Sequence, residues 1–201
     1  MNNTIEAILT FWFGELDEHG YAAEERNKLW FQGGAATDAA IRTQFGAVHK
    51  QAQQGELDHW AGQPRGRLAL IIVLDQFSRN IFRGSGAAFS GDSKALELCQ
   101  EGLRLQHDLQ LAPSEQVFFY LPLEHSENLA DQKRCVELYT KLRDAAPPAY
   151  RKRAQSNLDY AVKHLDIIEQ FGRFPHRNKA LGRTSTEQEQ RYLETATTFG
   201  Q

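Results

Sequence analysis

The stretch PRGRLALIIVLDQFSRNIFR, residues 64–83, decides the fold of this chain. Its first half, Leu68 to Leu74, is apolar on every side of a helix. A helix that is apolar all round is buried all round. We therefore predict a central helix over about Gly66 to Phe82 that runs through the middle of the molecule, with a polar end that emerges where other elements meet.

The second half of the same stretch carries polar side chains at helical spacing, since positions four apart share one face. The patch contains one carboxylate, two amides and two guanidiniums next to an apolar core. Its residues are Asp75, Gln76, Arg79, Asn80 and Arg83. Ligand binding is one interpretation. The other is structural, with Asp75–Arg79 as an intrahelical pair and Arg83 as a helix-end cation favoured by the dipole.

The amino-acid composition is typical of a soluble globular protein. It has 201 residues, 41% of them hydrophobic and 24% charged, with a formal net charge of −3. That length suffices for a single domain over residues 1–201 with a sizeable core. The slight acidity gives no reason to expect nucleic acid or an anionic membrane as a partner.

No apolar run approaches the ~20 residues that a membrane span needs. The N-terminal segment lacks the basic region and cleavage site of a signal peptide, so we expect a cytoplasmic protein. Cys99 and Cys135 lie inside predicted helices, and we expect reduced structural thiols there rather than a disulfide or a metal pair.

Residue usage favours helix throughout, with five Val and eight Ile against twenty-two Leu and twenty-three Ala. Apolar periodicity predicts about nine helices, many of them adjacent antiparallel pairs, in an all-α helical hairpin stack or irregular bundle. The other expected helices cover about 4–13, 24–31, 37–54, 93–107, a segment from Pro113, one carrying Leu129 to Leu142, one from about Tyr150 to Ile168, and 186–197.

Several helix ends carry recognisable signals. We predict Thr4 as the first cap and Asp92 or Ser90 as the cap of the 93–107 helix. Pro122 should break or kink its helix because proline gives no backbone donor. The following helix should be capped by Ser126 or Asn128, and the last by a capping box of Thr184 and Glu187.

Two further segments contain histidine. In Leu123–Glu127, His125 is flanked by carboxylates just after Pro122, which suits either a general base or a capping segment. His164 borders the apolar face of the long helix. A lone histidine there is more often a hydrogen-bonded core residue than a ligand.

The strongest polar segment is FGRFPHRNKALGRTST, residues 171–186, with four cations and no Asp or Glu. Phe174, Pro175 and neighbouring apolar residues should pin this loop down. Guanidinium donates in a planar, bidentate manner, which suits phosphate or carboxylate. The alternative is that these arginines cap helices and bridge to acidic residues elsewhere. The candidates are Arg173, His176, Arg177, Asn178 and Arg183.

Metal and cofactor motifs are missing from the sequence. No H-E-x-x-H, paired E-x-x-H or cysteine–histidine framework occurs, so we predict no metal site. There is also no phosphate-binding or dinucleotide-binding glycine motif and no G-x-S-x-G, and we predict no cofactor.

Four ordered motifs carry a resemblance: FWFG at 11–14, LDQFSRNIFR at 74–83 followed by AFSGD at 88–92, FYLPLEHSENLADQ at 119–132, and FGRFPHRNKALGRTSTEQE at 171–189. The chain resembles the bacterial domain of unknown function 924 family over nearly its whole length. The resemblance implies an all-helical array of the tetratricopeptide-like superhelical type and a set of signature polar residues, but no activity. No 34-residue repeat supports a regular solenoid.

We hypothesise that these polar segments converge on one pocket for a small anionic ligand. Arginines 79, 83, 173, 177 and 183 would bind the anion. His125, His164 or His176, oriented by Asp75 or Glu127, would transfer protons, so a cofactor-independent enzyme is one outcome. The alternative is a peptide- or protein-binding helical-repeat module whose polar network is a structural clasp. Sequence alone leaves the reaction and the oligomeric state open.

Overall fold

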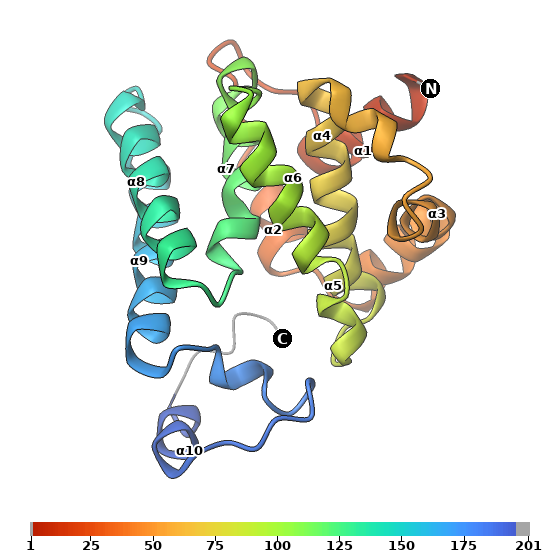
Figure 1. Ribbon diagram of the computed structural model, residues 1–201. Helices are drawn as coiled ribbons and strands as arrows, with labels where there is room; N and C mark the ends of the chain where they lie inside the picture. Colours follow the sequence, from red (N-terminus) through yellow and green to blue (C-terminus); the bar gives the residue numbers. More distant parts are fainter. Residues whose placement is uncertain (1, 196–201) are drawn as a thin grey trace. The chain divides into compact units, whose positions relative to one another are not determined.

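Helices make up the regular structure of the computed structural model, which describes residues 2–195 (Figure 1). The α-helices are α1 (Asn2–Phe13), α2 (Arg26–Phe31), α3 (Ala35–Gln53), α4 (Pro64–Ile71), α5 (Ser78–Ile81), α6 (Asp92–Arg104), α7 (Pro113–Glu124), α8 (Leu129–Ala145), α9 (Arg151–Phe171) and α10 (Glu187–Leu193). A π-helical segment, Ile72–Phe77, joins α4 to α5 without a break. Short 3₁₀ turns cover Asp58–Gly62, Gly86–Phe89, Asp108–Gln110 and Pro175–Arg177.

The all-α prediction with about nine helices is confirmed, because the run 64–81 counts as one helix. Over residues 2–195, extended pairing is limited to one isolated antiparallel bridge between Leu16 and Ala22. The described chain divides into two compact units. The first holds the residues up to Arg83 and Ala87–Pro122, and the second holds Gly84–Gly86 and the residues from Leu123 onward. A single domain over 1–201 stays a prediction.

The run of residues 64–81 is the buried centre of the first unit. Pro64 occupies the first turn of α4, where its fixed φ and missing N–H are tolerated. Every side chain from Leu68 to Leu74 has 0% exposure, as the all-round apolar pattern predicted. The predicted polar end is exposed only at its last residues, Phe82 and Arg83. Asp75 is 0% exposed and Arg79 only 8%, because carboxylates and carbonyls of the same unit surround the guanidinium.

The π-helical turn also departs from the regular α-helix that the sequence predicted. A π-turn widens the helix by one residue and is frequent at functional sites. Here side chains reach two of its carbonyls. Ser78 Oγ donates to Leu74 O at 2.6 Å, and Arg79 Nη1 donates to Asp75 O at 2.7 Å.

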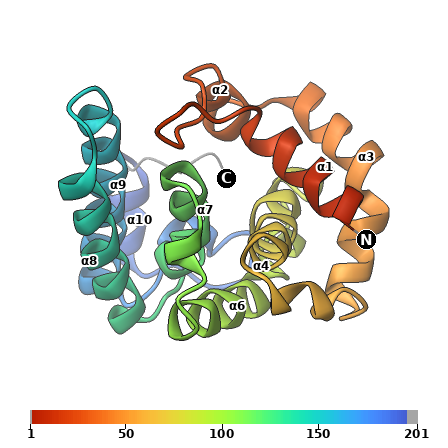
Figure 2. The same cartoon turned by 90° about the horizontal axis from the view of Figure 1, so that it is seen from above.

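Aromatic side chains fill the first unit around this run. Phe77 stacks on Phe45 with a centroid separation of 5.1 Å and contacts Phe11 edge-on at 6.2 Å. Trp12 bridges Phe77 and Phe118 at 5.6 and 5.5 Å. Accordingly α3 packs against α5. Helix α4 packs against α1 and α6 (Figure 2).

The second unit is built on the adjacent helices α8 and α9, which pack along each other (Figure 1). Tyr139 and Cys135 from α8 and Ala161 from α9 are buried in it. Helix α9 is followed by Gly172 as its C-terminal cap. The φ of Gly172 is 67°, the left-handed conformation that favours glycine. Beyond it, Phe174 is fully buried against Ile167 and Ile168, with Phe171 and Tyr192 packed alongside.

Two predicted start signals were wrong. Helix α1 already begins at Asn2, so Thr4 lies within it rather than capping it. Helix α6 begins at Asp92 after Gly91, and no side chain caps it. The Asp92 carboxylate binds Arg79 instead. Asn128, by contrast, caps α8 as predicted, accepting from Ala130 N at 2.8 Å.

Pro122 and the last capping box also differ from their predictions. Pro122 does not break α7, which continues to Glu124. Gln132 Nε2 donates to Glu124 O and Ser126 O at 2.6 and 2.7 Å and satisfies these carbonyls at and just after the helix end. The last capping box consists of Thr186 and Glu189 rather than Thr184 and Glu187. Residues 196 and 197 of the predicted last helix lie outside the described part of the chain.

Candidate functional site

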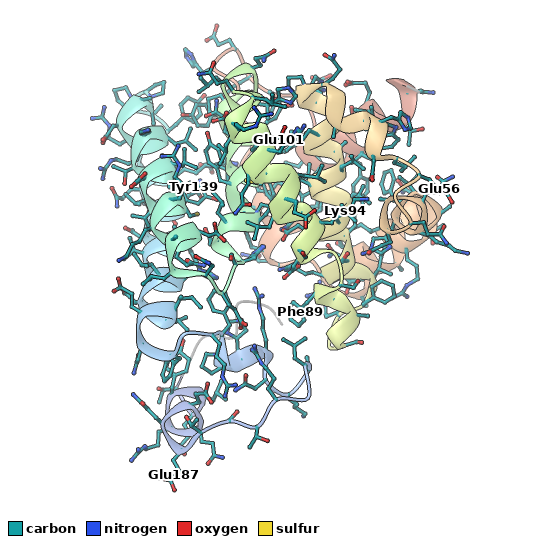
Figure 3. All side chains as sticks on the ribbon, viewed as in Figure 1. Glu56, Phe89, Lys94, Glu101, Tyr139 and Glu187 are labelled. Atoms are coloured by element: carbon teal, nitrogen blue, oxygen red, sulfur yellow. The ribbon has the colours of Figure 1, made fainter. Side chains whose placement is uncertain are left out.

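Arg79 is the centre of the polar cluster in the first unit. Its guanidinium donates to both oxygens of Asp92 at 2.9 and 3.1 Å and lies 3.3 Å from Asp75 Oδ1. It also lies over the ring of Phe89, which is labelled in Figure 3, at 5.7 Å from the centroid. Burial acts to lower the pKa of Arg79, but the charges of Asp75 and Asp92 outweigh it and raise this pKa. The predicted Asp75–Arg79 pair therefore exists, with a second carboxylate on the same cation.

Asp38 organises the other predicted residues of this unit. Arg83 donates to its two oxygens at 2.8 and 2.9 Å, and Asn80 Nδ2 donates to Oδ1 at 2.8 Å. The hydrogen bond from Arg83 keeps the pKa of Asp38 below its ordinary value, although burial opposes this. Gln76 donates to Asp75 instead. The two amides, four residues apart, thus face different carboxylates.

Glu127 and Arg183 tie two polar segments of the second unit together. Arg183 Nη1 and Nη2 donate to the two oxygens of Glu127 at 2.7 and 2.9 Å. Phe174 N also donates to Glu127 Oε1 at 2.8 Å, and Arg183 returns a bond to Phe174 O at 3.0 Å. Burial acts to raise the pKa of Glu127, but these bonds lower it below its ordinary value. Glu127 therefore accepts hydrogen bonds as an ionised carboxylate.

Glu189 holds the other end of the arginine-rich loop. Arg173 donates to its two oxygens at 2.6 and 2.8 Å, and Asn178 Nδ2 lies 3.4 Å from Oε2. The Arg173 hydrogen bond, with help from Thr186 N, lowers the pKa of Glu189 to about 2. Asn178 also donates to Ser185 Oγ at 3.0 Å. These contacts fold the loop onto α10.

Three histidines and Arg177 gather around Phe174. The His164 and His176 rings lie 5.5 and 5.4 Å from the Phe174 centroid, and His125 lies 6.5 Å from His164. The Arg177 guanidinium lies over Phe174 at 4.6 Å, and its Nη1 donates to the His125 carbonyl at 3.0 Å. We call these five residues the Phe174 cluster.

Burial and nearby positive charge keep His164 and His176 of the Phe174 cluster neutral. Burial lowers the pKa of His164 to about 3, with smaller effects from His125, Arg177 and His176. Burial followed by Arg177 lowers the pKa of His176 to about 4. At neutral pH both imidazoles therefore carry a lone pair and one N–H.

Glu124 stands beside His164 and was not among the predicted site residues. Its Oε1 lies 3.4 Å from His164 Nδ1, and both side chains are buried, with 8% and 6% exposure. Nδ1 is also 2.9 Å from Tyr160 O, an acceptor, which assigns the proton to Nδ1. In the sequence, Glu124 directly precedes His125 and so was one of the two carboxylates that flank this histidine. The sequence did not show whether Glu124 or Glu127 would contact a histidine.

The structure therefore groups the thirteen predicted residues within the two units. The first unit brings together Asp75, Gln76, Arg79, Asn80 and Arg83, with Asp38 and Asp92 as additional partners. The second brings together His125, Glu127, His164, Arg173, His176, Arg177, Asn178 and Arg183, with Glu124 and Glu189 as additional partners. Convergence of both groups on one pocket stays a prediction.

The described helices and side chains also bear on membrane insertion and metal binding. Among residues 2–195, no helix combines the length and the apolar content that crossing a bilayer requires. In the same part of the chain, no three or more His, Cys, Asp and Glu side chains are grouped so that they could hold a metal ion.

Comparisons with known proteins agree with the sequence motifs. The family model described as "Bacterial protein of unknown function (DUF924)" matches residues 8–197. A solved structure of a protein of unknown function from Agrobacterium tumefaciens is similar, with a TM-score of 0.82 and 34% sequence identity over 97% of this chain and 99% of that one. No functionally curated protein matches. The chain therefore belongs to the DUF924 family of bacterial proteins of unknown function.

Proposed function

We propose that the second unit binds a small anionic ligand, a phosphate or a carboxylate, at the Phe174 cluster. The observation that carries the proposal is the position of Arg177, which is 7% exposed, lies over Phe174 and is accompanied by three imidazoles. A guanidinium supplies planar donors to an anion, and a neutral imidazole can add one N–H. The neighbouring Arg183 Nε is a buried donor without a hydrogen-bond partner among residues 2–195, and an oxyanion would satisfy it.

The other predicted cations support this choice by their contacts. Arg173 and Arg183 are each held by both oxygens of a glutamate, and Arg79 and Arg83 are each held by an aspartate. Apart from Arg183 Nε, a ligand would have to displace these carboxylates to bind there. These four arginines fit the structural clasp of the alternative hypothesis. The Arg177 guanidinium lies over the Phe174 ring and its Nη1 donates to the His125 carbonyl, so the proposal puts the anion beside this ring.

Acid–base chemistry on the bound anion is part of the proposal. With its proton on Nδ1, His164 presents Nε2 as a proton acceptor. Glu124 next to Nδ1 would orient the ring and stabilise an imidazolium, as the carboxylate of a catalytic triad does. This makes Glu124, rather than Asp75 or Glu127, the orienting carboxylate of the proposal. A cofactor-independent enzyme with this dyad would move a proton to or from the ligand.

The test is a thermal-unfolding screen of the protein with phosphate, sulfate and small carboxylates. A ligand at a hundred times its Kd should stabilise the protein by ~2.7 kcal/mol. The matched pair of variants is Arg177→Gln and Lys179→Gln, because both remove one positive charge from the same loop and Lys179 is exposed. Only Arg177→Gln should lose the ligand-induced shift, and Arg177→Lys should retain part of it.

Two results would count against anion binding. One is an equal ligand response in Arg177→Gln and Lys179→Gln. The other is a melting temperature that does not respond to any of these anions, together with a large fall in Arg177→Gln alone. That second pattern would favour the alternative, a clasp within a peptide- or protein-binding module.

A further inference from the structure

We infer that Arg67 and His107 form an acid-sensitive latch, which holds the turn after α6 closed at neutral pH and releases it when His107 takes up a proton. The latch lies in the first unit and does not depend on the proposed anion site. Three observations carry the inference: the direction of one hydrogen bond, the contacts of a buried cation, and a residue in the left-handed conformation beside His107.

The hydrogen bond between Arg67 and His107 determines which nitrogen of the imidazole is protonated. Arg67 Nε donates to His107 Nδ1 at 3.2 Å. A guanidinium nitrogen only donates, so Nδ1 must offer its lone pair and the neutral ring carries its proton on Nε2. An imidazolium has an N–H on both nitrogens. It could not accept this bond, and it would face a like charge.

Arg67 is a buried cation whose hydrogen bonds all go to uncharged acceptors. The residue is 4% exposed. Besides the bond to His107, its Nη1 donates to Leu98 O at 2.9 Å and its Nη2 donates to Ala61 O at 2.8 Å. Buried charges are normally paired with a counter-ion. A second positive charge on His107 would therefore meet a guanidinium that no carboxylate is bonded to.

The other charged and titratable groups around His107 come from α6, from the chain next to it and from α7. Glu101, labelled on α6 in Figure 3, is held by Arg104 with N–O distances of 2.8 and 2.6 Å. Asp108 directly follows His107 and accepts a hydrogen bond from the Tyr120 hydroxyl at 2.8 Å. Both carboxylates favour an imidazolium, but each already has a partner.

The balance of these effects is against a proton on His107. Burial and the charge of Arg67 act to lower the pKa of His107, whereas Asp108 and Glu101 act to raise it. The result is a pKa below the ordinary value for histidine. This direction agrees with the hydrogen bond, in which Nδ1 is an acceptor.

Gln106 joins α6 to His107 in a conformation that disfavours a side chain. Its φ is 56°, in the left-handed region. Gln106 N donates to Leu103 O at 3.2 Å and His107 N donates to Gly102 O at 2.9 Å. These are the two backbone bonds of a Schellman motif, in which the left-handed position is usually glycine. Because this turn has glutamine there, it needs other contacts to stay closed.

Arg67 supplies those contacts. A Cβ built at Gly102 would stand 2.6 Å from Arg67 Cδ, so the arginine packs directly on the last turn of α6. In many Schellman motifs an apolar contact between the positions of Gly102 and His107 closes the turn. Here Arg67 takes that place, with its stem on Gly102 and its Nε on His107. Loss of the bond to His107 should therefore open residues 105–107.

Amide hydrogen exchange of the intact protein, measured by NMR from about pH 7.5 to about pH 5.5, tests the latch. The His107 amide is the reporter, because its bond to Gly102 O closes the turn. After correction for the intrinsic exchange rate, its opening equilibrium should increase by up to about tenfold over this range, since an open imidazole titrates near about 6.5. The Leu98 amide within α6 should keep its protection, which separates local opening from general unfolding.

Two variants attribute the change to the imidazole and to the turn. His107→Asn places an amide oxygen near the position of Nδ1, where it can accept from Arg67 but does not titrate. Opening at residue 107 should then be the same at both ends of the pH range. Gln106→Gly relieves the left-handed strain, so opening should fall by roughly threefold at each pH while its pH dependence remains.

If His107→Asn does not fold, nitrogen chemical shifts of the wild-type protein provide a second measurement. Near pH 7.5, His107 should show a proton on Nε2 and none on Nδ1. Opening at residue 107 that does not change with pH overturns the latch, as does a pH dependence that survives in His107→Asn or a proton on Nδ1 at neutral pH. Anion binding is measured separately on the second unit, so failure of the latch and failure of the proposed function are distinguishable.

Discussion

Glu127 and Arg183 are 56 residues apart in the sequence and form a two-pronged ion pair, with N–O distances of 2.7 and 2.9 Å. The pair ties the segment before α8 to the loop after α9. Because Phe174 N and Phe174 O join the same pair, it also fixes the aromatic ring on which the Phe174 cluster is built. The ion pair and the Phe174 cluster are therefore neighbouring parts of one arrangement.

Removing one charge of this pair should destabilise the second unit. Glu127→Gln keeps the size of the side chain but leaves Arg183, whose side chain is 24% exposed, without its counter-ion. Hydrogen bonds to charged groups contribute about 1.5–3 kcal/mol, so we expect a loss of about 2 kcal/mol in urea unfolding. The exposed Glu194→Gln is the control and should change stability by less than about 0.5 kcal/mol. Equal effects of the two variants would contradict a stabilising role for the pair.

The fold was largely predictable because its main determinants are local. The all-round apolar run Leu68 to Leu74 identified the buried helix, and apolar residues three and four apart identified most of the others. The π-turn was not predictable, since a single widened turn keeps the same apolar residues inside. The cap assignment of Asp92 failed for a related reason: its carboxylate is used by Arg79, thirteen positions earlier in the chain.

The candidate site was predictable only in part. The high density of cations in residues 171–186 predicted a candidate site there, but the acidic residues that pair with these cations are distant in sequence. Arg83 meets Asp38 across 45 positions and Arg173 meets Glu189 across 16. No periodicity marks such partners. Glu124 lies in the predicted segment Leu123–Glu127. Only its contact with His164 of α9 distinguishes its role from that of Glu127.

Gly91 lies against the π-turn, and the contact leaves no room for a side chain. A Cβ built at Gly91 would stand 2.3 Å from Leu74 O and 2.9 Å from Leu74 C. Backbone atoms cannot swing aside, so Gly91→Ala should cost about 3 kcal/mol or more. Gly46→Ala is the matched control, because a Cβ there meets nothing within 4 Å inside α3. It should stabilise the protein by up to about 1 kcal/mol. Urea unfolding of both variants tests the packing, and a neutral Gly91→Ala would refute it.

Asp92 should be important for the first unit because it neutralises a buried cation. Arg79 is 8% exposed, and Asp92→Asn would leave it with Asp75 alone. Breaking a buried pair by removing one partner costs about 3–5 kcal/mol, and the partial exposure of Asp92 suggests the lower end. The control is Asp58→Asn, which breaks an exposed pair with Lys94 and should cost less than about 1 kcal/mol. Chemical denaturation of both variants gives the comparison, and similar losses would show that Arg79 does not need Asp92.

The buried histidines should make the protein lose stability in mild acid. The pKa of His164 is about 3 and that of His176 about 4 in the folded state, against about 6.5 for a histidine in an unfolded chain. As the pH falls below about 6.5, the unfolded state binds protons that the folded state does not, so the free energy of unfolding decreases. The stabilising contribution is complete above about pH 6.5 and is lost progressively toward the folded pKa values. Carboxylates with lowered pKa, such as Glu127, act mainly below about pH 4.5, which leaves the window from about pH 6.5 to 5 to the histidines.

Replacing His164 by Gln should flatten this pH dependence while keeping a polar side chain beside Tyr160 O. We expect the slope of unfolding free energy against pH, measured by urea titration between about pH 6.5 and 5, to fall by up to one proton in His164→Gln. A wild-type stability that is constant over this window, or a slope that His164→Gln does not alter, would mean that the imidazole is protonated in the folded protein. In that case His164 could not present the neutral Nε2 on which the proposed proton transfer depends.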